Sequence, residues 1–131
     1  FEQHDTIDWI AEGLIAYLEP HQHLPLFEMT HHNSGPQSRM ILTVMDGSSG
    51  SQNFQRMGVH IPWKKLSSLQ DVIRTAQQAG WNQVKIVHFD ELYQTYCCGC
   101  NCEDESHIVG NHNTRRPPVD LSGYVLVTLE K

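Results

Sequence analysis

All four cysteines of the chain lie within the six positions from 97 to 102, and two histidines follow within the next ten residues. Cysteine thiolates and histidine imidazoles are the usual ligands of tetrahedral zinc, and two cysteines in a C-x2-C spacing can bind one ion. A bound metal would also stabilise a segment that has few apolar side chains of its own. The sequence therefore predicts a structural zinc site whose four ligands are drawn from Cys97, Cys100, Cys102, His107 and His112.

Two other states of these cysteines stay open, namely reduced unligated thiols and a redox couple. The acidic residues Glu103 to Glu105 follow directly, and their charge disfavours the thiolate that a redox couple needs. A disulfide between cysteines this close together would constrain little of the unfolded chain. Small secreted domains use dispersed cysteines instead. We therefore expect an intracellular protein in a reducing compartment, cytoplasmic or nuclear.

A second group of histidines, at positions 21, 23, 31 and 32, flanks a predicted strand. In extended backbone His21 and His23 would point the same way, as ligands do in some metal sites. The alternative to a metal site is that all four histidines are exposed loop residues that bind no metal.

The chain also contains the residue types of a cysteine nucleophile with a histidine base. A thiol between Cys97 and Cys102, His107 or His88 as the base and Asp90 as the orienting acid would complete such a set. No local signature surrounds the thiols, and crowded thiols favour metal ligation. A Cys/His or zinc-dependent enzyme is therefore an alternative to the non-enzymatic protein that we expect.

Hydrophobic periodicity and turn residues predict the elements that must position these groups. Helices are expected over residues 7–18 and 69–79, the second capped by Ser68 and ended by Gly80. Strands are expected over 24–30, 39–45, 57–61, 84–89 and 124–129. The result is a single α+β domain over residues 1–131, with two helices on a mainly antiparallel sheet of four to five strands, in the order αβββαβ(loop)β. Its Cys/His-rich insertion spans about 90–120, a length that is uncommon unless the loop is functional.

Charge is distributed unevenly along the chain. Nine Lys and Arg stand against fifteen Asp and Glu, which gives a net charge of −6. Residues 1–38 contain six acidic side chains and no Lys or Arg, whereas residues 39–85 contain six basic and two acidic ones. No apolar run is long enough to cross a membrane, so we expect no membrane partner.

Residues 5–80 resemble a double-stranded-RNA-binding domain at three places. Leu26-Phe27-Glu28 leading into Asn33-Ser34-Gly35-Pro36 is similar to that family's first strand and its Gly-Pro loop. Met57-Gly58 resembles the end of the third strand, and Lys64-Lys65 the start of the basic second helix. The resemblance implies the order helix, three strands, helix, and RNA contacts from Gly35, Pro36, Lys64 and Lys65. Beyond residue 80 the chain has no counterpart in that family.

Together these patterns favour a small non-enzymatic binding or adaptor domain, of which inhibitors and immunity proteins are examples. Zinc would organise the Cys/His loop into a surface that recognises another protein, and no small-molecule cofactor is evident. The loop combines the acidic run Glu103 to Glu105 with the basic pair Arg115-Arg116, and Tyr93 and Tyr96 precede it as candidate anchors. A double-stranded-RNA-binding module is the first alternative, with RNA as the partner.

Overall fold

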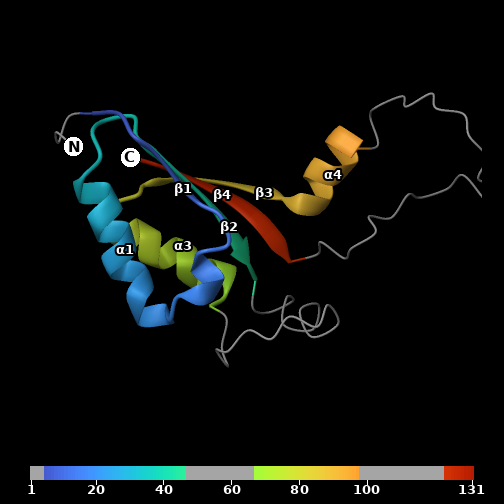
Figure 1. Cartoon of the computed structure of the whole chain (residues 1–131), viewed down its shortest axis with the longest axis horizontal. Coiled ribbons are helices and arrows are strands. Elements are labelled where there is room, and N and C mark those ends of the chain that lie inside the picture. Colours follow the sequence, from blue (N-terminus) through green and yellow to red (C-terminus); the bar gives the residue numbers. More distant parts are fainter. Residues whose placement is uncertain (1–4, 47–66, 98–122) are drawn as a thin grey trace, which may run out of the picture.

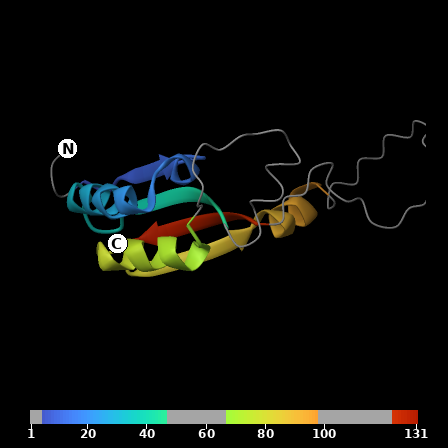
Figure 2. The same ribbon diagram turned by 90° about the horizontal axis from the view of Figure 1, so that it is seen from below.

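The computed structural model describes residues 5–46, 67–97 and 123–131, and the fold is given for these residues. They form a four-stranded sheet in the order β1-β2-β4-β3, with helices α1 and α3 packed against one of its faces (Figure 1). Figure 2 shows both helices running alongside the sheet. β1 is parallel to β2, and β4 is antiparallel to β2 and to β3. The chain is therefore an α+β protein with a mixed sheet.

The order of the elements is strand, short 3-10 turn, helix, strand, helix, strand, helix, strand. Their bounds are β1 (Asp8–Ala11), η1 (Ile15–Tyr17), α1 (Pro20–His32), β2 (Arg39–Met45), α3 (Leu69–Gln78), β3 (Gln83–His88), α4 (Phe89–Cys97) and β4 (Tyr124–Glu130). None of the helices in the described ranges has the length and apolar content that crossing a bilayer requires.

The helix predicted over residues 7–18 is wrong, because this stretch contains β1 and η1. A helix over these residues would place Ile10 on the apolar face with Ile7 and Leu14, whereas Ile10 is 76% exposed. Exposure alternates along β1 instead, as it does in a strand with one face on the core. Trp9 Nε1 donates to Ser34 Oγ over 2.8 Å, and the backbone N–H of Ile7 donates to Ser38 Oγ over 3.0 Å. These hydrogen bonds fix β1 beside the loop that leads into β2.

The strand predicted over residues 24–30 is also wrong, because these residues lie within α1. Glu19 and Gln22 form a capping box, in which Gln22 Oε1 accepts a hydrogen bond from the Glu19 N–H over 2.8 Å. Pro20 occupies the first helical position, where a missing N–H is tolerated. Pro25 removes one hydrogen bond from the second turn, and burial of Phe27 on the core side offsets that loss.

The other predicted elements in the described ranges are confirmed as helix or strand. β2, β3 and β4 form over the expected residues, and α3 begins at Ser68, whose Oγ accepts from the Asp71 N–H over 3.1 Å. Gly80 follows α3 with φ +107°, a conformation that L side chains rarely adopt. The predicted strand at 57–61 lies outside the described residues.

The first residues of the predicted 90–120 loop are helical. Asp90 and Glu91 lie in the first turn of α4, where acidic side chains interact favourably with the helix dipole. The loop prediction is therefore wrong for residues 90–97, and residues 98–122 lie outside the described ranges.

The core lies between the sheet and the two long helices. It is built from Phe27 of α1, Val72 and Ala76 of α3, and the inward side chains of β2 and β4, together with Trp81. Trp81 is fully buried, and its Nε1 donates to the Phe27 carbonyl over 3.2 Å. This bond ties the end of the α3 region to the middle of α1.

Candidate functional site

Asp46 joins several elements at one end of the sheet. Its backbone N–H donates to the Gly123 carbonyl over 2.9 Å, and its Oδ1 accepts from the Leu69 N–H over 3.4 Å. Asp46, Gly123 and the start of α3 border the stretches 47–66 and 98–122, which carry the predicted Lys and Cys/His residues. The fold therefore brings the attachment points of both stretches to the same end of the sheet.

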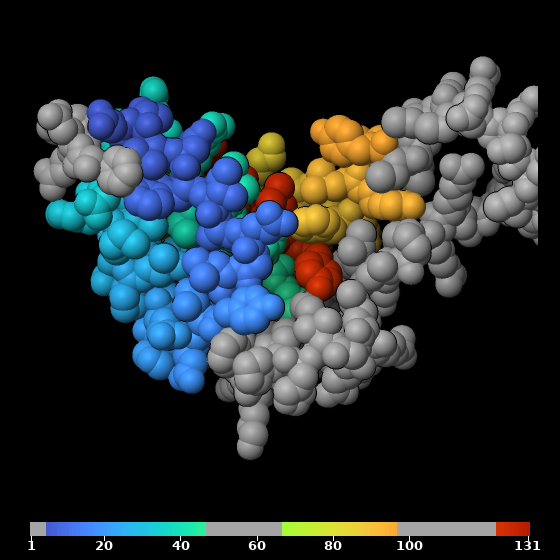
Figure 3. Space-filling view, in the orientation of Figure 1, coloured from blue at the N-terminus to red at the C-terminus, as the bar shows by residue number. Residues whose placement is uncertain are grey.

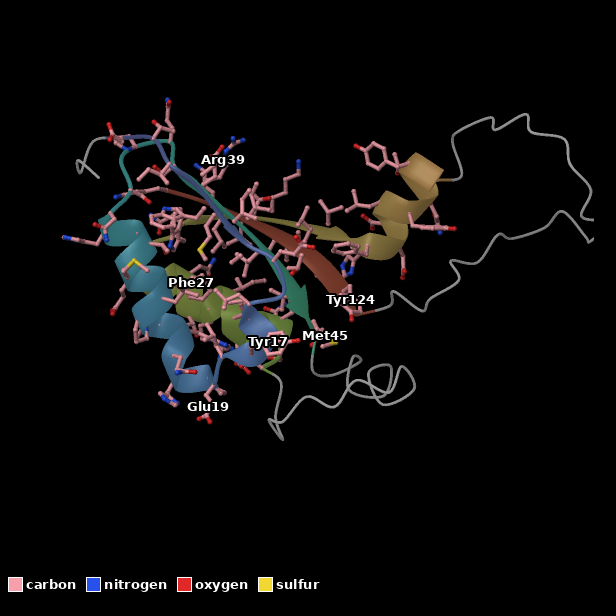
Figure 4. The ribbon with its side chains drawn as sticks, in the orientation of Figure 1. Tyr17, Glu19, Phe27, Arg39, Met45 and Tyr124 are labelled. Atoms are coloured by element: carbon pink, nitrogen blue, oxygen red, sulfur yellow. The ribbon has the colours of Figure 1, made fainter. Side chains whose placement is uncertain are left out.

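An apolar cavity of about 190 Å³ lies at this end of the sheet. It is lined by Gly13, Ala16 and Tyr17 from the chain between β1 and α1, by Thr43 and Met45 from β2, and by Tyr124 from β4. Figure 4 shows Tyr17, Met45 and Tyr124 close to one another at this end. The cavity combines apolar walls with two phenol groups, a composition typical of sites that bind apolar or aromatic groups.

Tyr124 connects this cavity to α4. Its ring packs edge-to-face against Phe89, the first residue of α4, with the ring centroids 6.1 Å apart. Burial raises the pKa of Tyr124, and the nearby Tyr17 raises it further. Tyr124 therefore keeps its neutral hydroxyl at physiological pH and can both donate and accept hydrogen bonds.

One tyrosine that lines the cavity and one on α4 are exposed. Tyr17 is 58% exposed, and Tyr96 on the last turn of α4 is 69% exposed, whereas Tyr93 is partly buried. Of the two anchors predicted from the sequence, Tyr96 is thus the surface residue. Tyr17 and Tyr124 were not predicted, because they come from opposite ends of the chain and no local pattern indicates that they meet.

Only one predicted zinc ligand falls within a described element. Cys97 is the last residue of α4, and its side chain lies outside the described residues. The other four predicted ligands, Cys100, Cys102, His107 and His112, lie in 98–122. Within the described ranges no three His, Cys, Asp or Glu side chains come together as a metal site.

The four histidines at positions 21, 23, 31 and 32 lie on or at the end of α1, so the extended arrangement predicted for His21 and His23 is wrong. Residues two apart on a helix point to nearly opposite sides. His21 is exposed beside Glu19, with 3.4 Å between Nδ1 and Oε2, whereas His23 is 2% exposed. Burial lowers the pKa of His23, and its buried Nε2 has no hydrogen-bond partner. The ring of His31 packs edge-to-face on Trp81.

The residues of the predicted nucleophilic set are likewise only partly described. His88 is exposed at the end of β3, and Asp90 is partly buried in the first turn of α4. The thiol and His107 lie outside the described side chains.

Of the four predicted RNA contacts, two lie within the described residues and two lie outside them. Gly35 is buried between α1 and β2, and its N–H donates to the Asp5 carbonyl over 2.8 Å. Pro36 is exposed, and its carbonyl accepts from Thr6 Oγ1 over 3.1 Å. Lys64 and Lys65 lie in 47–66, outside the described residues. The residues expected to form the family's first strand, Leu26-Phe27-Glu28, are part of α1.

No protein-family model matches the chain, and no similar sequence was found among curated proteins.

Proposed function

We propose that this chain is a non-enzymatic protein-binding domain whose recognition surface lies at the end of the sheet where β2 ends and β4 begins. The observation that carries the proposal is the group of tyrosines around one apolar cavity, with Tyr17 largely exposed and Tyr124 partly buried. Tyrosine combines a large apolar area with a hydroxyl, which makes it a frequent anchor in protein interfaces. Tyr96 on α4 is a further exposed tyrosine.

In this proposal the Cys/His-rich stretch supplies the remainder of the surface, and zinc organises it. The sequence supports zinc through the C-x2-C pair at Cys97 and Cys100, which Cys102, His107 and His112 can complete. The fold supports the location, because Gly123 is fixed to Asp46 beside the cavity and Phe89 of α4 contacts Tyr124. A loop held at both ends by a rigid scaffold is a common way to build a recognition site.

The charge of the described residues favours a protein partner over RNA. They contain ten Asp and Glu against four Lys and Arg, a difference of −6. Such a body repels polyphosphate at long range. A double-stranded-RNA-binding module remains the first alternative, and a Cys/His or zinc-dependent enzyme the second.

Metal content tests the zinc part of the proposal. The chain, purified without added metal and without chelator, is expected to contain one zinc per molecule by elemental mass analysis. Cys100→Ser is expected to weaken zinc binding by tenfold or more, since it removes one thiolate of the C-x2-C pair. His112→Gln tests whether His112 is one of the two ligands that complete the site. Cys98→Ser is the matched control, because Cys98 is not among the predicted ligands.

Four freely titratable thiols with no bound metal would contradict the zinc site. The RNA alternative predicts salt-sensitive binding to a duplex RNA that charge reversal of Lys64 and Lys65 abolishes. The enzyme alternative predicts turnover that disappears after a single Cys→Ser change. Either result would replace the protein-binding proposal.

A further inference from the structure

We propose that the outer edge of β1 is a docking site for an extended basic segment of another protein, which adds to the sheet as a fifth strand. The inference goes beyond the proposed function, because it depends on β1 and its flanking charges and holds with or without zinc. Its parts are the backbone groups of Asp8 and Ile10, the exposed Ile10 side chain and the exposed acidic side chains of Asp5 and Glu12.

β1 lies at one edge of the sheet. Its only partner among the described strands is β2. The hydrogen bonds show which backbone groups face β2: the Ile7 carbonyl accepts from the Arg39 N–H over 3.0 Å, and the Gly13 N–H donates to Thr43 Oγ1 over 2.7 Å. In a strand this direction alternates from one residue to the next. Within β1 the N–H and C=O groups of Asp8 and Ile10 therefore point away from β2, as required for pairing with an added strand.

The side chains along this edge are open to an approaching chain. Ile10 is 76% exposed, the highest value among the large apolar side chains in the described ranges. Leu14, just beyond the strand, is 39% exposed, and Glu12 is also exposed. Figure 3 shows the blue atoms of β1 and η1 on the near surface of the molecule. A strand that pairs here would bury Ile10 in addition to forming backbone hydrogen bonds.

The edge is held rigidly in its extended conformation. Asp8 and Arg39 form a two-pronged ion pair, with 3.0 Å between Arg39 Nε and Asp8 Oδ1 and 2.8 Å between Arg39 Nη2 and Asp8 Oδ2. Trp9 is fixed from the other face by Ser34. Because β1 is already ordered, binding has to order only the incoming segment, which lowers the entropic cost of binding.

Charge selects the partner. Along the edge itself Asp5, Asp8 and Glu12 are exposed acidic residues, and Arg39 of β2 pairs with Asp8, so Asp5 and Glu12 supply the excess negative charge. A basic strand is therefore attracted to this edge, and an acidic one is repelled. A second copy of this chain fits poorly, because antiparallel pairing of β1 with itself about Ile10 would place Asp8 directly opposite Glu12. Like charges in opposite positions of a sheet are destabilising.

The test uses the full chain and a labelled peptide in which lysine and valine alternate, with binding followed by fluorescence anisotropy at low ionic strength. The peptide is expected to bind and to be released by added salt. Two peptides are expected to bind much more weakly: one with all backbone amides N-methylated, which cannot form a strand ladder, and one with glutamate in place of lysine.

Variants of the chain locate the peptide on β1. Ile10→Pro removes an outward N–H without affecting the bonds to β2 and is expected to weaken binding about tenfold. Ile10→Val, which keeps that N–H, is its control. Glu12→Lys is expected to weaken binding about fivefold, and Glu91→Lys on α4, with the same change in net charge, is expected to have a smaller effect.

Equal binding of the N-methylated peptide would overturn the inference, because attraction would then be purely electrostatic. Equal peptide affinities of the Glu12→Lys and Glu91→Lys variants would also overturn the inference. This comparison does not need the Ile10→Pro variant to fold. Self-association of the chain that Ile10→Pro abolishes would assign the edge to a second copy and contradict a basic partner. Zinc content does not affect any of these results, so failure here and failure of the zinc proposal are distinguishable.

Discussion

Replacing Gly80 with alanine tests how α3, α1 and Trp81 are packed together. Gly80 has φ +107°, and a Cβ built on it would lie 2.8 Å from the His31 ring. A non-glycine residue in such a conformation costs about 1–3 kcal/mol. The His31 ring would also have to move away from Trp81, to which it packs at a centroid distance of 5.5 Å, and loss of such a contact costs about 0.5–1.5 kcal/mol. Gly80→Ala is therefore expected to lower the free energy of unfolding by about 2–4 kcal/mol.

Gly13→Ala is the matched control for the backbone contribution. Gly13 also has a positive φ, +68°, but no heavy atom lies within 4 Å of a Cβ built there. Its expected cost is about 1–2 kcal/mol, from the backbone alone. The double variant Gly80→Ala/His31→Ala should be less destabilised than the sum of its single variants, by about 1 kcal/mol, because the second change removes the clash.

Urea unfolding followed by tryptophan fluorescence measures these values. Equal costs for Gly80→Ala and Gly13→Ala, together with additive effects in the double variant, would refute the proposed contact between Gly80 and His31.

Three further predictions concern single side chains. Ser68→Ala should lower the free energy of unfolding by about 1 kcal/mol, since Ser68 caps α3. Ser67→Ala is the control, and an equal loss of stability in both variants by urea unfolding would contradict the capping role of Ser68. Trp81→Phe should cost about 0.5–1.5 kcal/mol, because the Phe27 carbonyl loses the Trp81 N–H but still accepts from Thr30 Oγ1, and an unchanged unfolding midpoint would be incompatible with the bond to Trp81. Burial lowers the pKa of His23, so the unfolded chain takes up protons before the folded chain does. The free energy of unfolding should therefore be constant above about pH 7 and fall below about pH 6.5, by up to about 1.4 kcal/mol per pH unit. If urea unfolding showed the same loss between neutral and acidic pH in a His23→Leu variant as in the unchanged chain, His23 would be excluded as the cause.

The part of the fold that the sequence predicts correctly carries strong local signals. β2 and β4 are nearly continuous apolar runs, and α3 combines a Ser68 cap, an apolar stripe and a terminal glycine. α4 could have been found as well, since Asp90 and Glu91 precede apolar residues at helical spacing. The helical interpretation of residues 7–18 failed because it assumed that Ile10 is buried.

The prolines show why α1 was missed. A proline after a helical pattern is typical of a helix end, as Pro20 is after residues 7–18, but a proline is equally suited to the first position of a helix. Glu19 and Gln22 distinguish the two cases, because their side chains form a capping box and so mark the start of a helix at Pro20. Pro25 is a residue that a helix interior rarely contains, yet it lies inside α1, where Phe27 is buried in the core.

The candidate site was predictable only in part. Its cysteine and histidine spacing is visible in the sequence, but the meeting of Tyr17 with Tyr124 and the bonds of Asp46 to Gly123 and Leu69 depend on strand order. Strand order is a long-range property for which local patterns carry little information.

The central claim is that zinc bound by the Cys/His segment completes a recognition surface beside Tyr124. A zinc titration of the isotopically labelled, metal-free chain, followed by amide NMR, tests it most directly. Saturation at one zinc per chain is expected, with shifts at Tyr96, Gly123 and Tyr124 and unchanged resonances for Trp81 and Val127 in the core. A titration that shifts no resonance near the α4 end, or that shifts the core equally, would contradict the claim.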